Sequence, residues 1–151
     1  MFADEEGQRK RATVLSVVAG LLCGLGWWMY IDATARGSDK DNSHTDDTAG
    51  YSWICGTLVT IFFVMLNGFK WSELDPDSDG HVKARLFLLF TILVGLSGVV
   101  GALFIMLKEY TDRNPEPPEG TWPGVAIMIQ CLIIFVAAFI MRAGTMQSSP
   151  V

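Results

Sequence analysis

Residues 12–31 form a run of twenty residues that contains no charged side chain. A helix rises about 1.5 Å per residue, so this run would be about 30 Å long, which matches the hydrocarbon core of a bilayer. The basic trio Arg9 to Arg11 precedes the run, and Asp32 ends it. It is also longer than the apolar core of a signal peptide, which has about 7 to 15 residues. These features predict a membrane span.

Three further apolar runs lie at residues 51–69, 86–107 and 123–141. Each is long enough to cross a bilayer. Open strands would leave backbone polar groups unpaired in lipid, so helices are the expected structure. Pro123 suits the start of a helix, where its missing N–H has no internal partner. We therefore predict an all-α fold, an integral membrane four-helix bundle that makes residues 1–151 one domain.

Composition narrows the classes of function. Half of the residues are hydrophobic, only 18% are charged, and the mean hydropathy is +0.34. Four spans and their loops use nearly all of the 151 residues, which leaves no room for a separate soluble catalytic domain. A net charge of -5 without a basic stripe argues against nucleic acid as a partner.

The distribution of Lys and Arg predicts how the spans are oriented. One side of the expected membrane carries seven basic residues: Arg9, Lys10, Arg11, Lys70, Lys83, Arg85 and Arg142. The other side carries four: Arg36, Lys40, Lys108 and Arg113. Because basic residues accumulate on the cytoplasmic side, both termini are predicted to be cytoplasmic.

Every Trp and Tyr residue lies near an end of a predicted span. These side chains favour the headgroup region, where an apolar ring and a polar tip are both accommodated. We interpret them as interfacial anchors rather than as groups that stack on a ligand, together with Asp32 at the exit of the first span. The main anchors are Trp27, Trp28, Tyr30, Trp53, Trp71 and Trp122.

No metal, cofactor or catalytic site is predicted. The turn from Asp75 to Gly80 matches the first half of an EF-hand loop, but Leu86 occupies the position of its bidentate Glu. A solvated acidic turn is the preferred interpretation. The first outer loop has acidic residues without a fixed ligand spacing, and the three cysteines are scattered in spans without a Cys-x-x-Cys motif.

Two amides are the main polar groups inside the predicted spans. Gln130 lies near the middle of the fourth span, and Asn67 lies near the end of the second. An amide in hydrocarbon needs a partner, so each is expected to form an interhelical hydrogen bond. No ionisable side chain lies deep in a span, which counts against a proton-coupled transporter or an intramembrane hydrolase.

Small residues four apart occur in the first and third spans. They allow two helix backbones to approach closely, either within the chain or with a partner. The three pairs are Gly20 with Gly24, Ser97 with Gly101, and Gly98 with Ala102.

Four strings, read together, resemble one family over nearly the whole chain: residues 26–33 (GWWMYIDA), 64–68 (VMLNG), 84–87 (ARLF) and 122–126 (WPGVA) with Gln130. They are similar to the transmembrane protein 50 family, which includes yeast vacuolar protein sorting protein 68. The resemblance implies a four-span protein of endosomal and endoplasmic reticulum membranes without catalytic activity. It also implies a second small four-span protein, vacuolar protein sorting protein 55, as partner in late endosome-to-vacuole sorting.

The resulting hypothesis is a non-enzymatic subunit of a small membrane complex that assists endosomal or vacuolar sorting. It would reside in the bilayer of the endosome, the endoplasmic reticulum or the Golgi. Two alternatives from other classes stay open. One is a small transporter or channel lined by Asn67, Gln130 and the Ser and Thr residues of the spans. The other is an interfacial enzyme that uses the Asp and His residues of the first outer loop.

Overall fold

A computed structural model describes residues 2–37, 46–69, 80–111 and 122–147 of the chain. All regular secondary structure in these ranges is helical, as predicted. The elements are α1 (Phe2–Gly37), α2 (Asp46–Gly68), α3 (His81–Ile105) with the short π-helix η2 (Met106–Thr111) directly after it, and α4 (Trp122–Gln147).

Four of the described helices are long and apolar enough to cross a bilayer, judged by length and composition. Their apolar segments are Glu6–Ala35, Tyr51–Gly68, His81–Lys108 and Trp122–Thr145. The helices extend beyond the predicted spans because charged residues at the ends are also helical. In α1, for example, Lys10 forms an ion pair with Glu6 one turn earlier, with an N–O distance of 2.9 Å.

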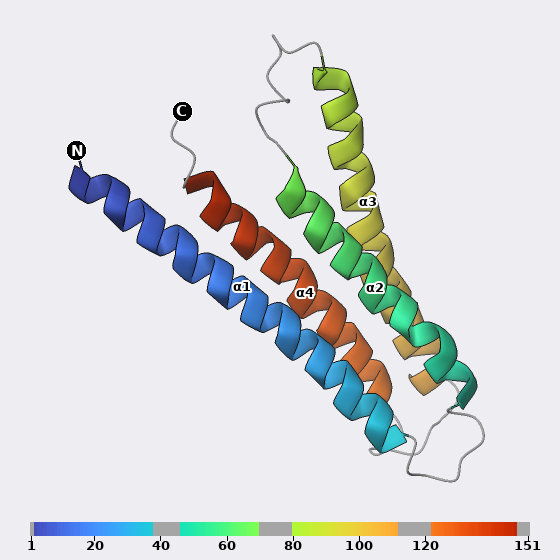
Figure 1. Ribbon diagram of the computed structural model, residues 1–151. Helices are drawn as coiled ribbons and strands as arrows, with labels where there is room; N and C mark the ends of the chain where they lie inside the picture. The colour runs from blue at the N-terminus through green and yellow to red at the C-terminus, as the bar shows by residue number, and fades with distance from the viewer. Residues whose placement is uncertain (1, 38–45, 70–79, 112–121, 148–151) are drawn as a thin grey trace.

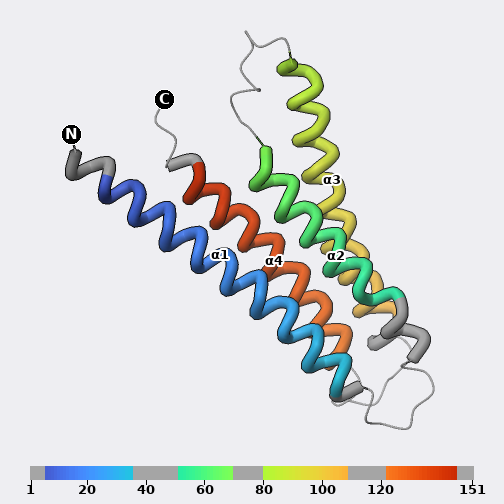
Figure 2. Tube along the Cα trace, viewed as in Figure 1, coloured from blue at the N-terminus to red at the C-terminus, as the bar shows by residue number. Residues whose placement is uncertain are grey.

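The helices alternate in direction along the chain. In Figures 1 and 2, α4 lies between α1 and α2, and α3 packs along α2. The neighbouring helices α1 and α4 are antiparallel, as are α2 and α3, whereas α2 and α4 run parallel. Consequently α1 begins and α4 ends at the same end of the bundle.

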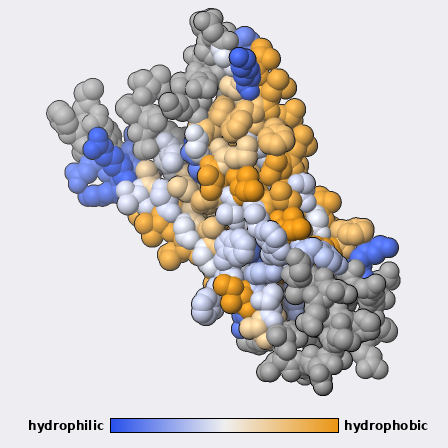
Figure 3. All heavy atoms as spheres, turned by 45° about the vertical axis from the view of Figure 1, so that its right-hand side comes forward, coloured by the Kyte–Doolittle hydropathy of each residue, from blue (hydrophilic) through white to orange (hydrophobic). Residues whose placement is uncertain are grey.

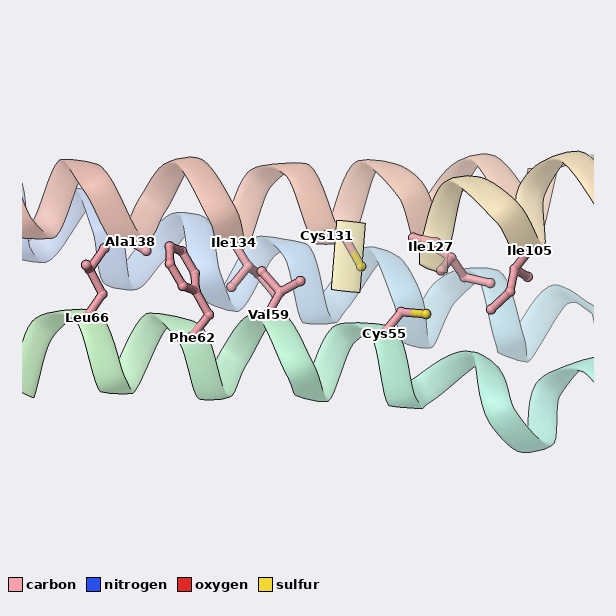
Figure 4. Packing of buried hydrophobic residues seen from close by; sticks show 10 residues of the cluster. Cys55, Val59, Phe62, Leu66, Ile105, Ile127, Cys131, Ile134 and Ala138 are labelled. Atoms are coloured by element: carbon pink, nitrogen blue, oxygen red, sulfur yellow. The ribbon is translucent and has the colours of Figure 1, made fainter. Parts of the chain in front are cut away.

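The core lies mainly between α2 and α4. Each helix contributes four buried residues at successive spacings of four, three and four, the pattern of a coiled-coil seam. They are Cys55, Val59, Phe62 and Leu66 from α2, and Ile127, Cys131, Ile134 and Ala138 from α4 (Figure 4). The ring of Phe62 also stacks on that of Phe135 at a centroid distance of 4.9 Å. This seam joins the two helix pairs.

The contact between α1 and α4 rests on small residues seven positions apart. On α1 the repeat consists of Ala12, Ala19, Gly26 and Ala33, and on α4 of Ala137 and Gly144. Seven residues before Ala137, Gln130 contributes its backbone oxygen to the same contact. A Cβ built on Gly26 would lie 3.3 Å from the carbonyl oxygen of Gln130, and one on Gly144 would lie 3.3 Å from that of Ala12. Ala19 and Ala137 lie between these two contacts, one on each helix, and both are fully buried.

Side chains of α2 pack against glycines of α3. A Cβ on Gly95 would lie 2.6 Å from Cγ of Phe62, and one on Gly98 would lie 2.5 Å from Cγ2 of Val59. Ala102, one turn further along α3, is fully buried. The absence of bulk on this face of α3 therefore sets how closely it approaches α2.

The outward faces of α1 and α3 are apolar. On α1, exposed large side chains include Val14, Val17, Leu21, Leu25 and Trp28, and similar residues continue along α3. The space-filling view shows an extensive hydrophobic surface in orange over the upper right part of the molecule, with paler residues across its middle (Figure 3). An apolar exterior of this kind suits contact with lipid.

Candidate functional site

Gln130 is the most unusual side chain of the bundle. It is fully buried near the middle of the apolar part of α4, where α1 and α2 both contact that helix. Its backbone oxygen lies against Gly26 of α1, and its side-chain amide lies against Gly56 of α2. A Cβ on Gly56 would be 2.5 Å from Nε2 of Gln130. Gly56 thus provides the space that the amide occupies, whereas Gly26 lets α1 approach the backbone of α4.

Neither polar atom of the Gln130 amide has a hydrogen-bond partner in the described part of the chain. The interhelical hydrogen bond expected of this residue is therefore not formed there. Leaving a buried polar group unpaired costs about 1–3 kcal/mol. Such a group in a folded protein calls for an explanation, and strain, a functional role or a bound molecule are the usual ones.

Asn67 does make a contact between helices. Its Nδ2 donates to the carbonyl oxygen of Phe63 at 2.8 Å within α2 and to that of Ala138 on α4 at 3.4 Å. Its Oδ1 is buried without a partner among the described residues. Both predicted amides therefore lie between α2 and α4, with unused hydrogen-bonding capacity.

Two polar pairs connect α1 to α2. Nε1 of Trp27 donates to the hydroxyl of Thr60 at 3.1 Å, and that hydroxyl donates to the carbonyl oxygen of Gly56 at 2.7 Å. Further along, the hydroxyls of Tyr30 and Ser52 are hydrogen-bonded at 3.1 Å. We call these four side chains, Trp27, Tyr30, Ser52 and Thr60, the α1–α2 junction.

The aromatic anchors divide into two groups. Trp28, Trp53 and Trp122 are 69%, 50% and 39% exposed, as a side chain at the membrane interface would be. Trp27 and Tyr30 instead turn toward α2 and contact each other edge to face, with a centroid distance of 5.9 Å. Adjacent residues of a helix point about 100° apart, so Trp27 faces inward while Trp28 faces outward.

The remaining predicted anchors are Asp32 and Trp71. Asp32 is half-buried near the end of α1. Trp71 lies outside the described residues.

The predicted small-residue pairs also differ in their surroundings. Gly98 and Ala102 lie in the contact between α3 and α2, and a Cβ on Gly101 would be 3.1 Å from Sγ of Cys55. Ser97 is exposed, and its hydroxyl donates to the carbonyl oxygen of Val94 in its own helix.

Gly20 and Gly24 are exposed, and a Cβ on either would have nothing within 4 Å. Within the chain, α1 instead packs through the repeat that contains Ala19 and Gly26. This repeat is visible in the sequence as small residues seven positions apart. A search for small residues four positions apart does not detect it.

Arg142 joins the ends of α2 and α4. Its guanidinium donates to the carbonyl oxygen of Phe69, just past the end of α2, at 3.4 Å. A cation at a helix C-terminus interacts favourably with the helix dipole and pairs a carbonyl that has no partner within the helix. The residue is therefore a structural link at the basic end of the bundle.

Among the described residues, no three His, Cys, Asp or Glu side chains gather where a metal ion could bind. The acidic side chains of the loop between residues 38 and 45 and of the turn at 75–79 lie outside the described part. Cys55 and Cys131 are free thiols in the core, and Cys23 is packed against it. The site with unexplained chemistry is therefore Gln130 and the α1–α2 junction.

The chain is similar over most of its length to proteins of known name. It is 25% identical over 134 residues to "Transmembrane protein 50 homolog" of Dictyostelium discoideum, covering 84% of this chain and 86% of that one. It is 24% identical over 156 residues to "Vacuolar protein sorting-associated protein 68" of Saccharomyces cerevisiae, covering 87% and 82%.

No solved structure matches the chain. The model of "Uncharacterised protein family (UPF0220)" matches residues 3–149. The resemblance deduced from the GWWMYIDA string and its companions is therefore confirmed, and the chain belongs to the UPF0220 family, with relatives among transmembrane protein 50 and the yeast sorting protein.

Proposed function

We propose that this protein is a non-enzymatic subunit of a small membrane complex that assists endosomal or vacuolar protein sorting. The name of the yeast relative supports a role in vacuolar sorting, and neither relative is named as an enzyme. Four helices able to cross a bilayer support a multipass membrane protein. The family resemblance implies endosomal and endoplasmic reticulum membranes, and the Golgi is a further compartment that we propose.

The observation that carries the subunit proposal is the open outer face of α1. Gly20 and Gly24 lie one turn apart on this face with nothing within 4 Å of either Cβ position. Small residues at this spacing allow a second helix to approach closely in a membrane, where packing rather than hydrophobicity drives association. Because α4 already occupies the opposite face of α1, this face is available to another protein. The family resemblance suggests a small multispan partner like vacuolar protein sorting protein 55.

Copurification in mild detergent tests the proposal. The native chain should recover a stoichiometric multispan membrane protein. Gly20→Leu and Gly24→Leu should lose it while the isolated chain keeps its helical content. Gly68→Leu is the matched control, because it places the same bulk at another exposed glycine with open surroundings. Recovery of the native chain as a monomer in several detergents, or equal recovery of the partner by all variants, would contradict the proposal.

We further propose that both termini are cytoplasmic. Described basic residues gather at the end of the bundle where α1 begins and α3 begins, namely Arg9, Lys10, Arg11, Lys83 and Arg85. A glycosylation acceptor inserted between residues 38 and 45 should then be modified in microsomes. An acceptor added before residue 2 should not be modified, and the reverse pattern would overturn this orientation.

A small transporter or channel is the second candidate function. The unpartnered amide atoms of Gln130 and Asn67 between α2 and α4 favour it, because polar groups line pathways through membranes. Reconstituted vesicles that pass ions or small solutes faster than empty vesicles, and lose this flux with Gln130→Met, would support it. Flux equal to that of empty vesicles would exclude it.

A further inference from the structure

We propose that the amide of Gln130 binds the hydroxyl group of a lipid dissolved in the membrane, and that the α1–α2 junction is the gate through which this lipid enters. This inference does not depend on a role in sorting. It starts from a side chain that is fully buried, polar and without a partner in the described part of the chain.

The amide defines the chemistry of the ligand. It offers an acceptor at Oε1 and two donors at Nε2, so a single hydroxyl could accept from one atom and donate to the other. Gly56 lies against the amide, and Gly26 lies against the backbone oxygen of the same residue. Neither these glycines nor the four side chains of the junction carry a charge. A charged ligand would find no counterion among them, so the bound group is expected to be neutral.

The contacts between helices indicate the route of entry. On one side, α4 packs tightly on α1 through the repeat that contains Ala19 and Gly26. On the other, α4 and α2 share the buried hydrophobic core. By contrast, α1 and α2 are barely in backbone contact and are connected by the side chains of the junction. Rotation of Trp27 and Tyr30 is therefore the smallest movement that exposes the amide.

The solvent exposure of the side chains supports the same route of entry. Trp27, Tyr30 and Thr60 are each partly exposed, whereas Gln130 has no exposed surface. Gly26, which touches Gln130, directly precedes Trp27, and Gly56, which also touches it, accepts the hydrogen bond of Thr60. Ser52, the fourth side chain of the junction, is itself buried. In the proposed arrangement Trp27, Tyr30 and Thr60 therefore form the outer layer, and the amide lies behind them.

The depth of Gln130 indicates that the ligand comes from the membrane. It lies eight residues beyond the start of α4, about 12 Å along the helix axis and within the apolar segment. Sterols and diacylglycerols carry one free hydroxyl on an apolar body and dissolve in a bilayer. Both have the required chemistry, and the experiment has to distinguish them.

Energy transfer from Trp27 to a fluorescent sterol tests the first source. A chain that retains Trp27, with the other four Trp residues changed to Phe, is reconstituted in phosphatidylcholine vesicles containing dehydroergosterol. Transfer should exceed that of randomly distributed sterol, and the sterol acetate, whose hydroxyl is blocked, should not exceed it. Because this comparison uses one chain and two probes, its outcome does not depend on how well a substituted site folds.

The second source is tested in parallel. Dioleoylglycerol replaces the sterol, a shift in Trp27 emission is the readout, and dioleoyl-acetylglycerol is the blocked control. A hydroxyl-dependent response in either arm supports the proposal and identifies the source. Absence of such a response in both arms overturns it.

Variants locate the binding group in whichever arm responds. Gln130→Met keeps the side-chain length without the amide, and it should weaken binding about five- to tenfold, the effect of losing one net hydrogen bond. Thr60→Val should strengthen binding, because the closed junction then competes less well. Thr57→Val is the matched control and should change nothing, since that exposed hydroxyl donates to the carbonyl oxygen of Trp53 within its own helix. Binding that is unchanged by Gln130→Met would contradict the proposed site.

Discussion

Gly56 and Gln130 share one small space between α2 and α4, where a Cβ on the glycine would come within 2.5 Å of Nε2 of the amide. The amide is the mobile end of a flexible side chain, whereas the surrounding helices are rigid. We therefore expect an added methyl group to be tolerated better at Gly56 than at glycines that face the backbone of another helix.

Gly98→Ala should destabilise the fold more than Gly56→Ala. The new methyl group at position 98 would meet Cγ2 of Val59 at 2.5 Å and the backbone oxygen of Cys55 at 3.0 Å, and a backbone carbonyl cannot move aside alone. We expect a loss of about 1–3 kcal/mol in the free energy of unfolding, measured by denaturant titration in detergent micelles. At position 56 the amide can rotate away, so the loss should be smaller. Gly68→Ala should be neutral, and an equal effect at all three sites would contradict this explanation.

Gly95→Ala should be rescued by a smaller residue at position 62. The added methyl group would lie 2.6 Å from Cγ of Phe62, whose ring is fully buried and stacked on Phe135. Gly95→Ala and Phe62→Leu should each destabilise the protein, and together they should lose less than the sum of the separate effects. The same unfolding measurement, arranged as a double-mutant cycle, checks this. Strict additivity would mean that the two residues do not press on each other.

The hydrogen bond from Trp27 to Thr60 should contribute modestly to stability. A cycle of Trp27→Phe and Thr60→Val should give a coupling free energy of about 0.6 kcal/mol, typical of hydrogen bonds between helices in membranes. Trp28→Phe, paired with the same Thr60 change, is the control because Trp28 is 69% exposed. Its coupling should be near zero, and an equal coupling for both tryptophans would argue against the observed bond.

Ala19→Leu should separate α1 from α4, whereas Gly20→Leu should not. Ala19 is fully buried in the seven-residue repeat, so added bulk is expected to cost about 1–3 kcal/mol. Gly20, its neighbour, faces open space. Denaturant titration in detergent micelles would measure the free energy of unfolding of both variants. A loss of stability with Gly20→Leu but not with Ala19→Leu would reverse the assignment of faces.

Gln130→Met should make the protein more stable. Replacing the unpaired amide with an apolar side chain of similar length removes a desolvation cost of about 1–3 kcal/mol. The free energy of unfolding should rise toward that amount in lipid-free detergent. A decrease would show that the amide has a partner that stabilises the fold.

Much of the fold could be predicted because a bilayer admits few structures. Uncharged runs such as residues 12–31 must satisfy their backbone polar groups internally, and helices do so. All four predicted runs correspond to described helices, and the second ends one residue past α2. The ends of the helices were predicted less well than their number. Charged residues beyond the apolar runs, such as those of the Glu6–Lys10 segment, are also helical.

The candidate site was only partly accessible from sequence. Gln130 stood out as an amide in an apolar run, and the expectation that it needs a partner followed from its burial alone. Its lack of one, and the inward turn of Trp27 toward Thr60, depend on helices far apart in the chain. Trp27 and Trp28 are identical in sequence terms, and only their positions relative to α2 distinguish them.

Sequence by itself therefore determined that the chain is helical, how many long apolar helices it has and which family it belongs to. Tertiary structure decided which face of each helix is used. Gly98 and Ala102 pack against α2 while Gly20 and Gly24 face outward, although both pairs have the same spacing. The physical reason is that lipid is as apolar as the interior of the bundle, so hydrophobicity does not mark the buried face. The buried face is instead determined by the close fit between particular side chains, and that fit exists only when the helices are packed together.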